Sequence, residues 1–223
     1  MKEKLIELLT VESLDNNILF NVLKEVSEIE IYEGKLFFFK NKTEIPSNTS
    51  LIFDEDSFIY CDEGEEYLRK MNTFVLNKVN KEGRDYHAVQ IFEGKCFNPN
   101  FFSLLAAHAM PYYQIVYQGV LKDDEFKDDT SILEKRLKVT VMHELGEIFA
   151  MNEGHDHFSI CEEHPIENNC VFNENKIRKN LRKASSEYIP LIKVKDFLPD
   201  YYCERCEEII SRGLEKRLIK PQI

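Results

Sequence analysis

One segment, SILEKRLKVTVMHELGEIFAMN at residues 131–152, constrains the fold of this chain more than any other. Ser131 and Glu134 fit an S-x-x-E capping box, in which each side chain satisfies a backbone amide left unpaired at a helix start. Apolar side chains then recur at helical spacing on one face: Leu133, Leu137, Val141, Leu145, Ile148 and Phe149. The segment therefore predicts one long amphipathic helix.

Shorter segments alternate between helix-like and strand-like patterns. Apolar residues at helical spacing predict further helices at 16–28, 64–83, 175–188 and 207–218. Strand-like runs lie at 50–62, 85–94 and 112–120. IEIYEGKLFFFK, residues 29–40, predicts a β-hairpin with its turn at Glu33-Gly34, whereas 101–110 fits either a helix or a buried strand. This alternation indicates an α/β or α+β layered fold.

Composition narrows the class of protein. A chain of 223 residues with 43% hydrophobic residues can build one full core, or one core with a small metal-stapled annex. The net charge of −11 argues against nucleic acid as a partner, and no run reaches the roughly 20 apolar residues of a membrane span. Acidic residues interrupt the apolar stretch at the N-terminus, so we expect no export signal, a cytoplasmic location and reduced cysteines.

The chemistry of the long helix lies in HELGE, residues 143–147. His143 and Glu147 are four residues apart and share one helix face, while Glu144 lies about 100° around the helix. In H-E-x-x-H metalloenzymes the groups at i and i+4 bind zinc, and the intervening glutamate deprotonates the bound water. Here a carboxylate replaces the second imidazole. Glutamate is an acceptable zinc ligand, so HELGE indicates either a metal site or a charged helix.

Two histidines follow the helix closely. Gly154 is placed to end the helix with positive φ, which turns the chain back and can bring His155 or His157 to the ligands. The other histidines have simpler interpretations: His87 and His108 lie in apolar runs as core residues, and His164 in a polar loop.

Four of the six cysteines form two spaced pairs: Cys161 with Cys170, and Cys203 with Cys206. Thiolates in a C-x-x-C can both bind one tetrahedral ion, and a second pair completes a four-cysteine zinc site. Such a site would order the polar stretch 152–173, which burial alone could hardly do. We prefer this structural zinc to a redox role. Cys61 and Cys96 stand alone in strand-like runs and are expected to be buried small hydrophobes.

The order of these features resembles the archaemetzincins, which show H-E-x-x-H-x-x-G-x-x-H-C, then a C-x-M, then a distal C-x-x-C. LEKRLKVTVM, with Arg136 seven residues before His143, is similar to the family's approach to its active-site helix. The resemblance covers the order of elements over 85–206 and the sequence detail over 131–206. It implies a metzincin-like α+β fold, in which a mixed sheet packs on helices, with the active-site helix at 131–152 and a zinc-stapled C-terminal part.

Carried over by position, the resemblance makes His143 the first zinc ligand and Glu144 the general base. It also makes four cysteines the ligands of a structural zinc: Cys161, Cys170, Cys203 and Cys206. The sequence departs from the family at four positions, and its gaps between cysteines are longer. Glu147 replaces the second histidine, Ala150 replaces the turn glycine, Glu153 occupies the place of the third ligand, and Phe172 stands where the family has methionine.

A second alignment restores part of the motif. If the helix is one turn longer, by about 5.4 Å, Gly154 takes the role of the turn glycine and His157 becomes the third metal ligand. His155 is the next alternative and Glu153 the third.

The leading functional hypothesis is a divergent zinc-dependent metallopeptidase that cleaves a peptide or protein substrate through a metal-activated water. The alternative is a catalytically inactive metzincin-like protein, with a structural zinc, that binds or regulates a partner. A carboxylate-rich metal site at His143 would also suit iron or manganese. We expect one domain, 1–223, with an N-terminal α/β part at 1–84, strands and the active-site helix at 85–157, and a zinc-stapled part at 158–223. The sequence is silent on the oligomeric state.

Overall fold

A five-stranded sheet forms the centre of the computed structural model, which describes residues 5–11, 17–43, 58–100, 103–122, 130–155, 170–174, 177 and 191–219. Its strands lie in the order β2 (Leu36–Thr43), β1 (Ile6–Val11), β4 (Asp85–Phe92), β8 (Tyr113–Tyr117) and β7 (Ala107–Met110). Neighbouring strands are parallel except for β7, which runs antiparallel to β8. A second, smaller sheet joins β3 (Phe58–Tyr60), β5 (Lys95–Asn98) and β6 (Ser103–Leu105).

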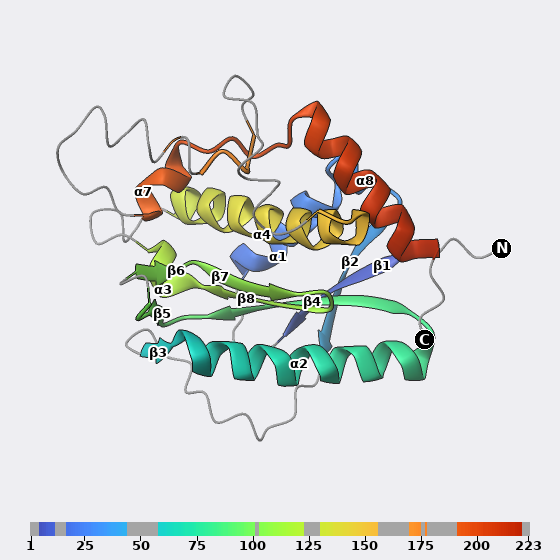
Figure 1. The fold of residues 1–223 in the computed structure, drawn as a ribbon, viewed down its shortest axis with the longest axis horizontal. Helices are drawn as coiled ribbons and strands as arrows, with labels where there is room; N and C mark the ends of the chain where they lie inside the picture. Colours follow the sequence, from blue (N-terminus) through green and yellow to red (C-terminus); the bar gives the residue numbers. More distant parts are fainter. Residues whose placement is uncertain are drawn as a thin grey trace.

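Helices cover both faces of the central sheet (Figure 1). On one face lies α2 (Cys61–Glu82), and on the other lie α1 (Asn17–Ser27) and α4 (Thr130–Glu153). An outer layer is added by α8 (Glu204–Ile219), which packs on α4, while the short α3 (Gln118–Leu121) and α7 (Leu191–Asp196) contact α4 as well. Because β4 and β8 are buried throughout, each face carries its own hydrophobic core, as expected for parallel strands covered on both sides.

Two glycines allow the outer layer to approach α4 closely. A Cβ at Gly213 of α8 would clash with the backbone carbonyl of Phe149, so the two helices touch backbone to backbone there. A Cβ at Gly146 of α4 would lie 2.6 Å from the ring of Phe172 and 3.0 Å from that of Tyr202. The fourth residue of HELG is therefore glycine because the C-terminal segment packs directly on it.

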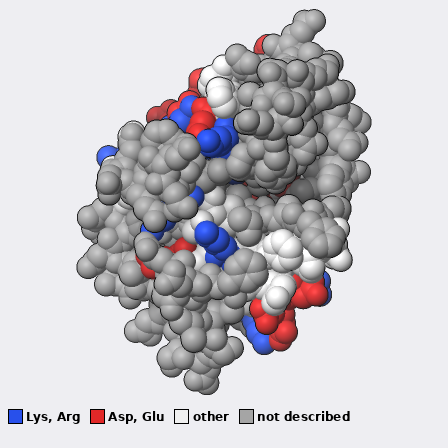
Figure 2. All heavy atoms as spheres, turned by 90° about the vertical axis from the view of Figure 1, so that its left-hand side faces the viewer, with Lys and Arg blue, Asp and Glu red and all other residues white. Residues whose placement is uncertain are grey.

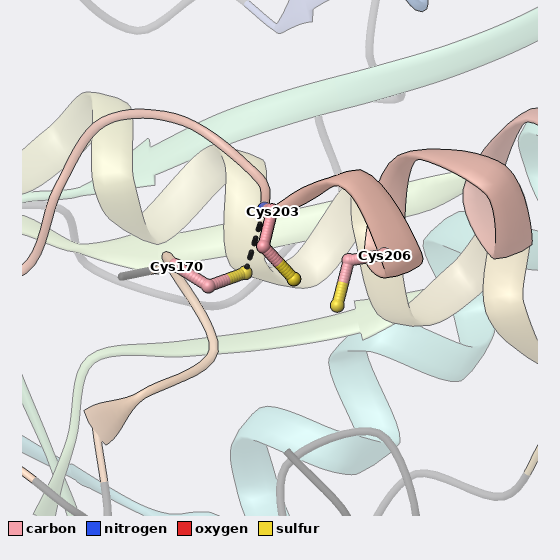
Figure 3. Close-up of side chains that lie close together, drawn as sticks. All are labelled: Cys170, Cys203 and Cys206. Atoms are coloured by element: carbon pink, nitrogen blue, oxygen red, sulfur yellow. Dashed lines mark hydrogen bonds between the residues drawn. The ribbon is translucent and has the colours of Figure 1, made fainter. Parts of the chain in front are cut away.

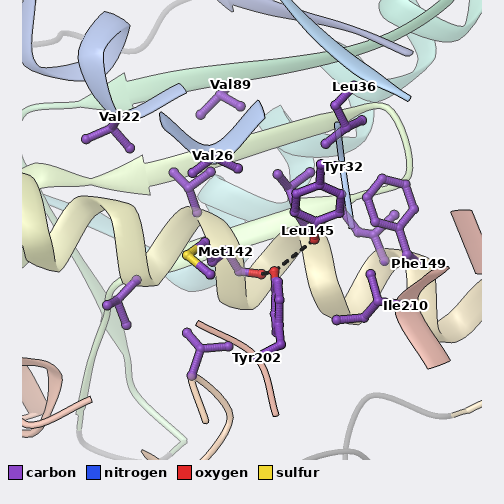
Figure 4. Close-up of a cluster of buried hydrophobic side chains, with 14 of the residues drawn as sticks. Val22, Val26, Tyr32, Leu36, Val89, Met142, Leu145, Phe149, Tyr202 and Ile210 are labelled. Atoms are coloured by element: carbon purple, nitrogen blue, oxygen red, sulfur yellow. Dashed lines mark hydrogen bonds between the residues drawn. The ribbon is translucent and has the colours of Figure 1, made fainter. Parts of the chain in front are cut away.

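A buried pair of phenols connects three segments behind the HELGE stretch (Figure 4). The hydroxyl of Tyr202 donates to the backbone carbonyl of Met142 at 2.5 Å and lies 2.8 Å from the hydroxyl of Tyr32. Burial raises the pKa of both phenols well above the usual value, so both stay protonated. The pair fixes α4 at the residue before His143, between the turn that precedes β2 and the segment that leads into α8.

Two buried arginines fix the outer helices. Arg136 of α4 bonds to both carboxylate oxygens of Asp196 in α7, at 2.5 and 2.7 Å, and to the carbonyl of Leu121 at 2.9 Å. Arg217 of α8 makes the same two-fold contact with Asp85 of β4, at 2.9 and 2.7 Å. Because paired, planar contacts of this kind set orientation as well as distance, they define how α7 and α8 lie on the rest of the fold.

Most of the predicted elements are confirmed, including the mixed sheet packed on helices. The segments 16–28, 64–83 and 207–218 are helical as α1, α2 and α8, and 85–94 and 112–120 contain β4 and β8. The long helix extends one residue beyond the predicted 131–152 at each end. Ser131 therefore lies inside its first turn, and Glu134 accepts a hydrogen bond from the side chain of Asn21 in α1 at 3.3 Å.

The predicted hairpin at 29–40 is wrong. Residues 28–35 form turns, and β2 pairs in parallel with β1, a strand that the sequence patterns did not reveal. Residues 101–110, left open between helix and strand, contain β6 and β7. Within 50–62 the described strand is only β3, because α2 begins at Cys61. The predicted helix at 175–188 lies outside the described residues except for Ile177.

None of the described helices has the length and apolar character needed to cross a bilayer. The end of the molecule beside α7 and β3 is shown in Figure 2, where basic and acidic side chains of the described residues are interspersed.

Candidate metal centres

His143 and Glu147 lie together on one face of α4, as their spacing predicts. The Nε2 atom of His143 is 3.0 Å from Oε1 of Glu147, whose side chain is only 3% exposed. The ring of Phe172 stands against the imidazole, with 5.1 Å between ring centroids. The residue that replaces the family's methionine therefore packs directly on His143.

Glu144 is half-buried on α4. Tyr117 ends β8, and its pKa is raised by burial first, then by Cys96 and Cys61, and also by the charge of Glu144. The charge of Glu144 therefore acts on the phenol at the carboxyl end of β8.

The helix ends in a Schellman motif at Gly154. Gly154 has φ 103°, its amide donates to Met151 at 3.0 Å, and the amide of His155 donates to Ala150 at 3.1 Å. These two bonds satisfy the last carbonyls of the helix and reverse the chain, so the predicted role of Gly154 in ending the helix is confirmed. His157 and Cys161 lie outside the described residues, and His157 as the third ligand stays a prediction.

Glu153, the third alternative for that ligand, is engaged elsewhere. Its carboxylate pairs with Arg212 at 3.3 Å and with Lys216, both on α8. The hydrogen bond from Lys216 is the main cause that lowers the pKa of Glu153. Because two cations of the outer helix hold this carboxylate, it is a poorer candidate ligand than either histidine.

Three of the four predicted cysteine ligands come together (Figure 3). The Sγ atoms of Cys170, Cys203 and Cys206 lie within 4.8 Å of one another, and all three residues are buried. The amide of Cys203 donates to Sγ of Cys170 at 3.3 Å, a contact that favours a thiolate. A hydrogen bond with Cys170, together with burial, raises the pKa of the Cys206 thiol. Cys170 and the Cys203–Cys206 pair are therefore brought to one point from segments more than thirty residues apart.

Both groups fit zinc by their donor chemistry. Thiolates on one tetrahedral zinc ion stand about 3.8 Å apart, given Zn–S bonds of about 2.3 Å. The three sulfurs lie within 4.8 Å of one another, so small side-chain movements would bring them to that spacing. An imidazole nitrogen and a carboxylate oxygen on one zinc ion stand about 3–3.5 Å apart, and the His143–Glu147 separation is 3.0 Å. Among the described residues the thiol group has three donors, whereas the α4 group has two.

A third group of donors was missed in the sequence. Cys61, Glu65 and His108 have ligand atoms within 4.8 Å of one another. Cys61 is buried as predicted, but it begins α2 rather than continuing a strand, so Glu65 stands one turn further on the same helix face. The signal that could have revealed the group is this Cys-x-x-x-Glu spacing at a helix start.

The two histidines predicted as core residues differ from each other. His87 is fully buried, its Nδ1 lies 3.1 Å from the carbonyl of Pro111, and burial lowers its pKa to about 3. His108 is half-buried and contacts polar side chains, so the core interpretation holds for His87 only. Cys96 is buried, which confirms its expected place in the core.

Solved structures identify the fold. The chain is similar to the archaemetzincin of Methanopyrus kandleri (17% identity, 96% of this chain and 97% of that chain, TM-score 0.54). It is also similar to a zinc-dependent peptidase of Methanocorpusculum labreanum (15%, 92% and 99%, TM-score 0.57). A third match is the archaemetzincin of Archaeoglobus fulgidus, solved with malonate (12%, 92% and 99%, TM-score 0.53). No protein-family model and no curated protein matches the chain. The fold is that of the archaemetzincins, which confirms the resemblance found in the sequence.

Proposed function

We propose that this chain is a divergent zinc-dependent metallopeptidase. The observation that carries the proposal is the place of His143, Glu144 and Glu147, on one buried helix of a fold shared over nearly the whole chain with zinc-dependent peptidases. Fold likeness alone does not establish a reaction, because the chemistry resides in the site. The site supplies an imidazole, a carboxylate beside it and a second carboxylate one turn away.

The residues have distinct roles in this proposal. His143 and Glu147 hold the metal, and His157, three residues after the helix-ending glycine, supplies the third ligand. Zinc bound there supplies Lewis acidity, which polarises a carbonyl and lowers the pKa of a water. Glu144 takes a proton from the attacking water and returns it to the leaving amine. Because Glu147 carries a charge that histidine lacks, the Lewis acidity is weaker than with two imidazoles.

The edge strand β7 supports a peptide as the substrate. It is the last strand of the central sheet and contacts α4, and its four residues are half-buried. No strand among the described residues pairs with its outer side. An extended peptide can add to such an edge through main-chain hydrogen bonds, which would lay it beside the helix that carries Glu144.

The cysteines form a separate, structural centre in this proposal. Cys170, Cys203 and Cys206 hold zinc together with Cys161. Their position between α4 and the start of α8 supports a role in fixing the outer layer on the active-site helix.

Exchange of Glu144 for glutamine tests the catalytic part. We expect Glu144→Gln to lower cleavage of a pool of fluorescence-quenched peptides by about 10²–10⁴-fold, with no loss of bound zinc. Glu134→Gln, a matched carboxylate change ten residues earlier on α4, should leave both quantities unchanged. Persistent cleavage in Glu144→Gln would show that Glu144 is not the general base.

One observation favours a second candidate function, a catalytically inactive binding or regulatory protein. The contact of 3.0 Å between His143 and Glu147 could be a simple hydrogen bond that leaves α4 without a metal. Zinc content separates the candidates, because His143→Ala should remove one equivalent from the peptidase and none from the inactive protein. Anomalous scattering at the iron, manganese and zinc edges then identifies the ion at His143.

A further inference from the structure

The third donor group lies where α2 meets the edge strand β7. Cys61 and Glu65 occupy the first turns of α2, four residues apart, and His108 comes from β7. The sulfur of Cys61 is 3.3 Å from Nε2 of His108 and 3.9 Å from Oε1 of Glu65. Sulfur and nitrogen, or sulfur and oxygen, on one tetrahedral zinc ion stand about 3.5 Å apart. The three side chains therefore already have the spacing of ligands to a single ion.

A further contact holds the imidazole of His108 in this orientation. Its Nδ1 lies 2.8 Å from the hydroxyl of Tyr117, and the two rings are edge-on at 5.5 Å. Metal-binding histidines usually bond through their second nitrogen, which fixes the ring and the tautomer. Tyr117 thus leaves Nε2 of His108 facing Cys61.

A glycine in α2 leaves room for His108 and Tyr117. Gly64 lies between Cys61 and Glu65, and a Cβ there would stand 2.6 Å from the hydroxyl of Tyr117 and 3.4 Å from Nδ1 of His108. A side chain at this position would displace the hydroxyl of Tyr117, whereas its Cβ would only touch His108. The glycine, the tyrosine and the three donors are consistent with one built site.

We propose that Cys61, Glu65 and His108 bind a divalent transition metal of the zinc class, separately from the thiol group and from His143. Thiolate, imidazole and carboxylate together suit zinc, whereas a calcium or magnesium site would use oxygen donors. Three protein ligands leave a fourth position for water or another small ligand. Glu65 and His108 are half-buried, so that position is on the open side of the site.

Zinc content of the full chain tests the proposal, with each variant compared with the wild type so that other zinc sites cancel. After loading with Zn²⁺ and desalting, Cys61→Ala and His108→Asn should each lose one equivalent. Cys96→Ala removes another buried thiol, from β5, and should lose none. Glu65→Gln should weaken zinc binding in a chelator competition, whereas Glu66→Gln, a change of the neighbouring exposed carboxylate, should not.

Zinc affinity of Tyr117→Phe distinguishes metal binding by His108 from a purely structural role of the cluster. Loss of an outer hydrogen bond to a metal-bound histidine costs about 10–100-fold in metal affinity, and we expect that weakening at this one site. Wild-type protein supplies a test free of folding defects, because Zn²⁺ should protect Cys61 from alkylation, as read by peptide mass spectrometry. Equal zinc content in wild type and Cys61→Ala, or alkylation of Cys61 that Zn²⁺ does not slow, would overturn the proposal.

Discussion

The two groups that contain cysteine lie on opposite sides of the central sheet and differ in burial. Cys170, Cys203 and Cys206 are enclosed in the core between α4 and the start of α8, whereas Glu65 of α2 and His108 of β7 are half-buried. A closed all-thiol set is typical of a structural zinc, and a mixed set of three donors keeps a position open. The contrast separates an ion that would hold the fold together from one that could exchange without unfolding it.

The largest expected effect is on stability at the closed group. Cys203→Ala should lower the free energy of unfolding in zinc-containing buffer by more than about 4 kcal/mol, since it removes a metal ligand from the core. Cys61→Ala, the matched change at the open group, should cost about 1 kcal/mol. Urea unfolding followed by circular dichroism measures both. Equal costs at the two cysteines would remove the distinction between a structural and an exchangeable ion.

The next effect concerns the ion pair that fixes α7 on α4. Asp196→Asn leaves the guanidinium of Arg136, which is 1% exposed, without its carboxylate, and we expect a loss of about 3 kcal/mol. Arg136→Met should cost less, because the side chain of Asp196 is 33% exposed and water can solvate it. Thermal unfolding of both variants measures the difference. A larger loss in Arg136→Met would show that packing of the long side chain outweighs its charge.

Much of the fold was predictable because the patterns were local. The helix that carries HELGE and its end at Gly154 followed from apolar spacing and turn chemistry, and both are confirmed. The hairpin at 29–40 failed because residues 36–43 pair in parallel with β1, far along the chain. A run of phenylalanines indicates a strand but not its partner, and parallel pairing leaves no local turn signal.

The candidate sites show the same limit. The C-x-x-C spacing predicted a site shared by Cys203, Cys206 and Cys170, and the three do converge. The group at Cys61 was missed because the strand-like run before it concealed a helix start, and because His108 joins it only through the tertiary fold. Spacing reveals ligands on one helix, while ligands from different elements depend on the three-dimensional arrangement.

A smaller effect tests how closely α8 packs on α4. Glycine to alanine within a helix normally stabilises by up to about 1 kcal/mol, yet Gly213→Ala should destabilise by about 2 kcal/mol, since the new methyl group would overlap the carbonyl of Phe149. Glu208→Ala, on an exposed position of α8, should change stability by less than about 0.5 kcal/mol. Urea unfolding of both variants gives the sign. A stabilised Gly213→Ala would mean that α8 can shift on α4.

His87 is fully buried and His108 is half-buried. The buried His87 predicts how the free energy of unfolding depends on pH. Burial lowers the pKa of His87 to about 3 from 6.5, so between these values the unfolded chain binds a proton that the folded chain does not. Stability therefore falls as pH decreases through that window, by up to about 1.4 kcal/mol per pH unit from this residue. Urea unfolding at several values from pH 7 to pH 5 measures the slope, and His87→Gln should reduce it by that amount. An unchanged slope in His87→Gln would assign the acid sensitivity to other groups.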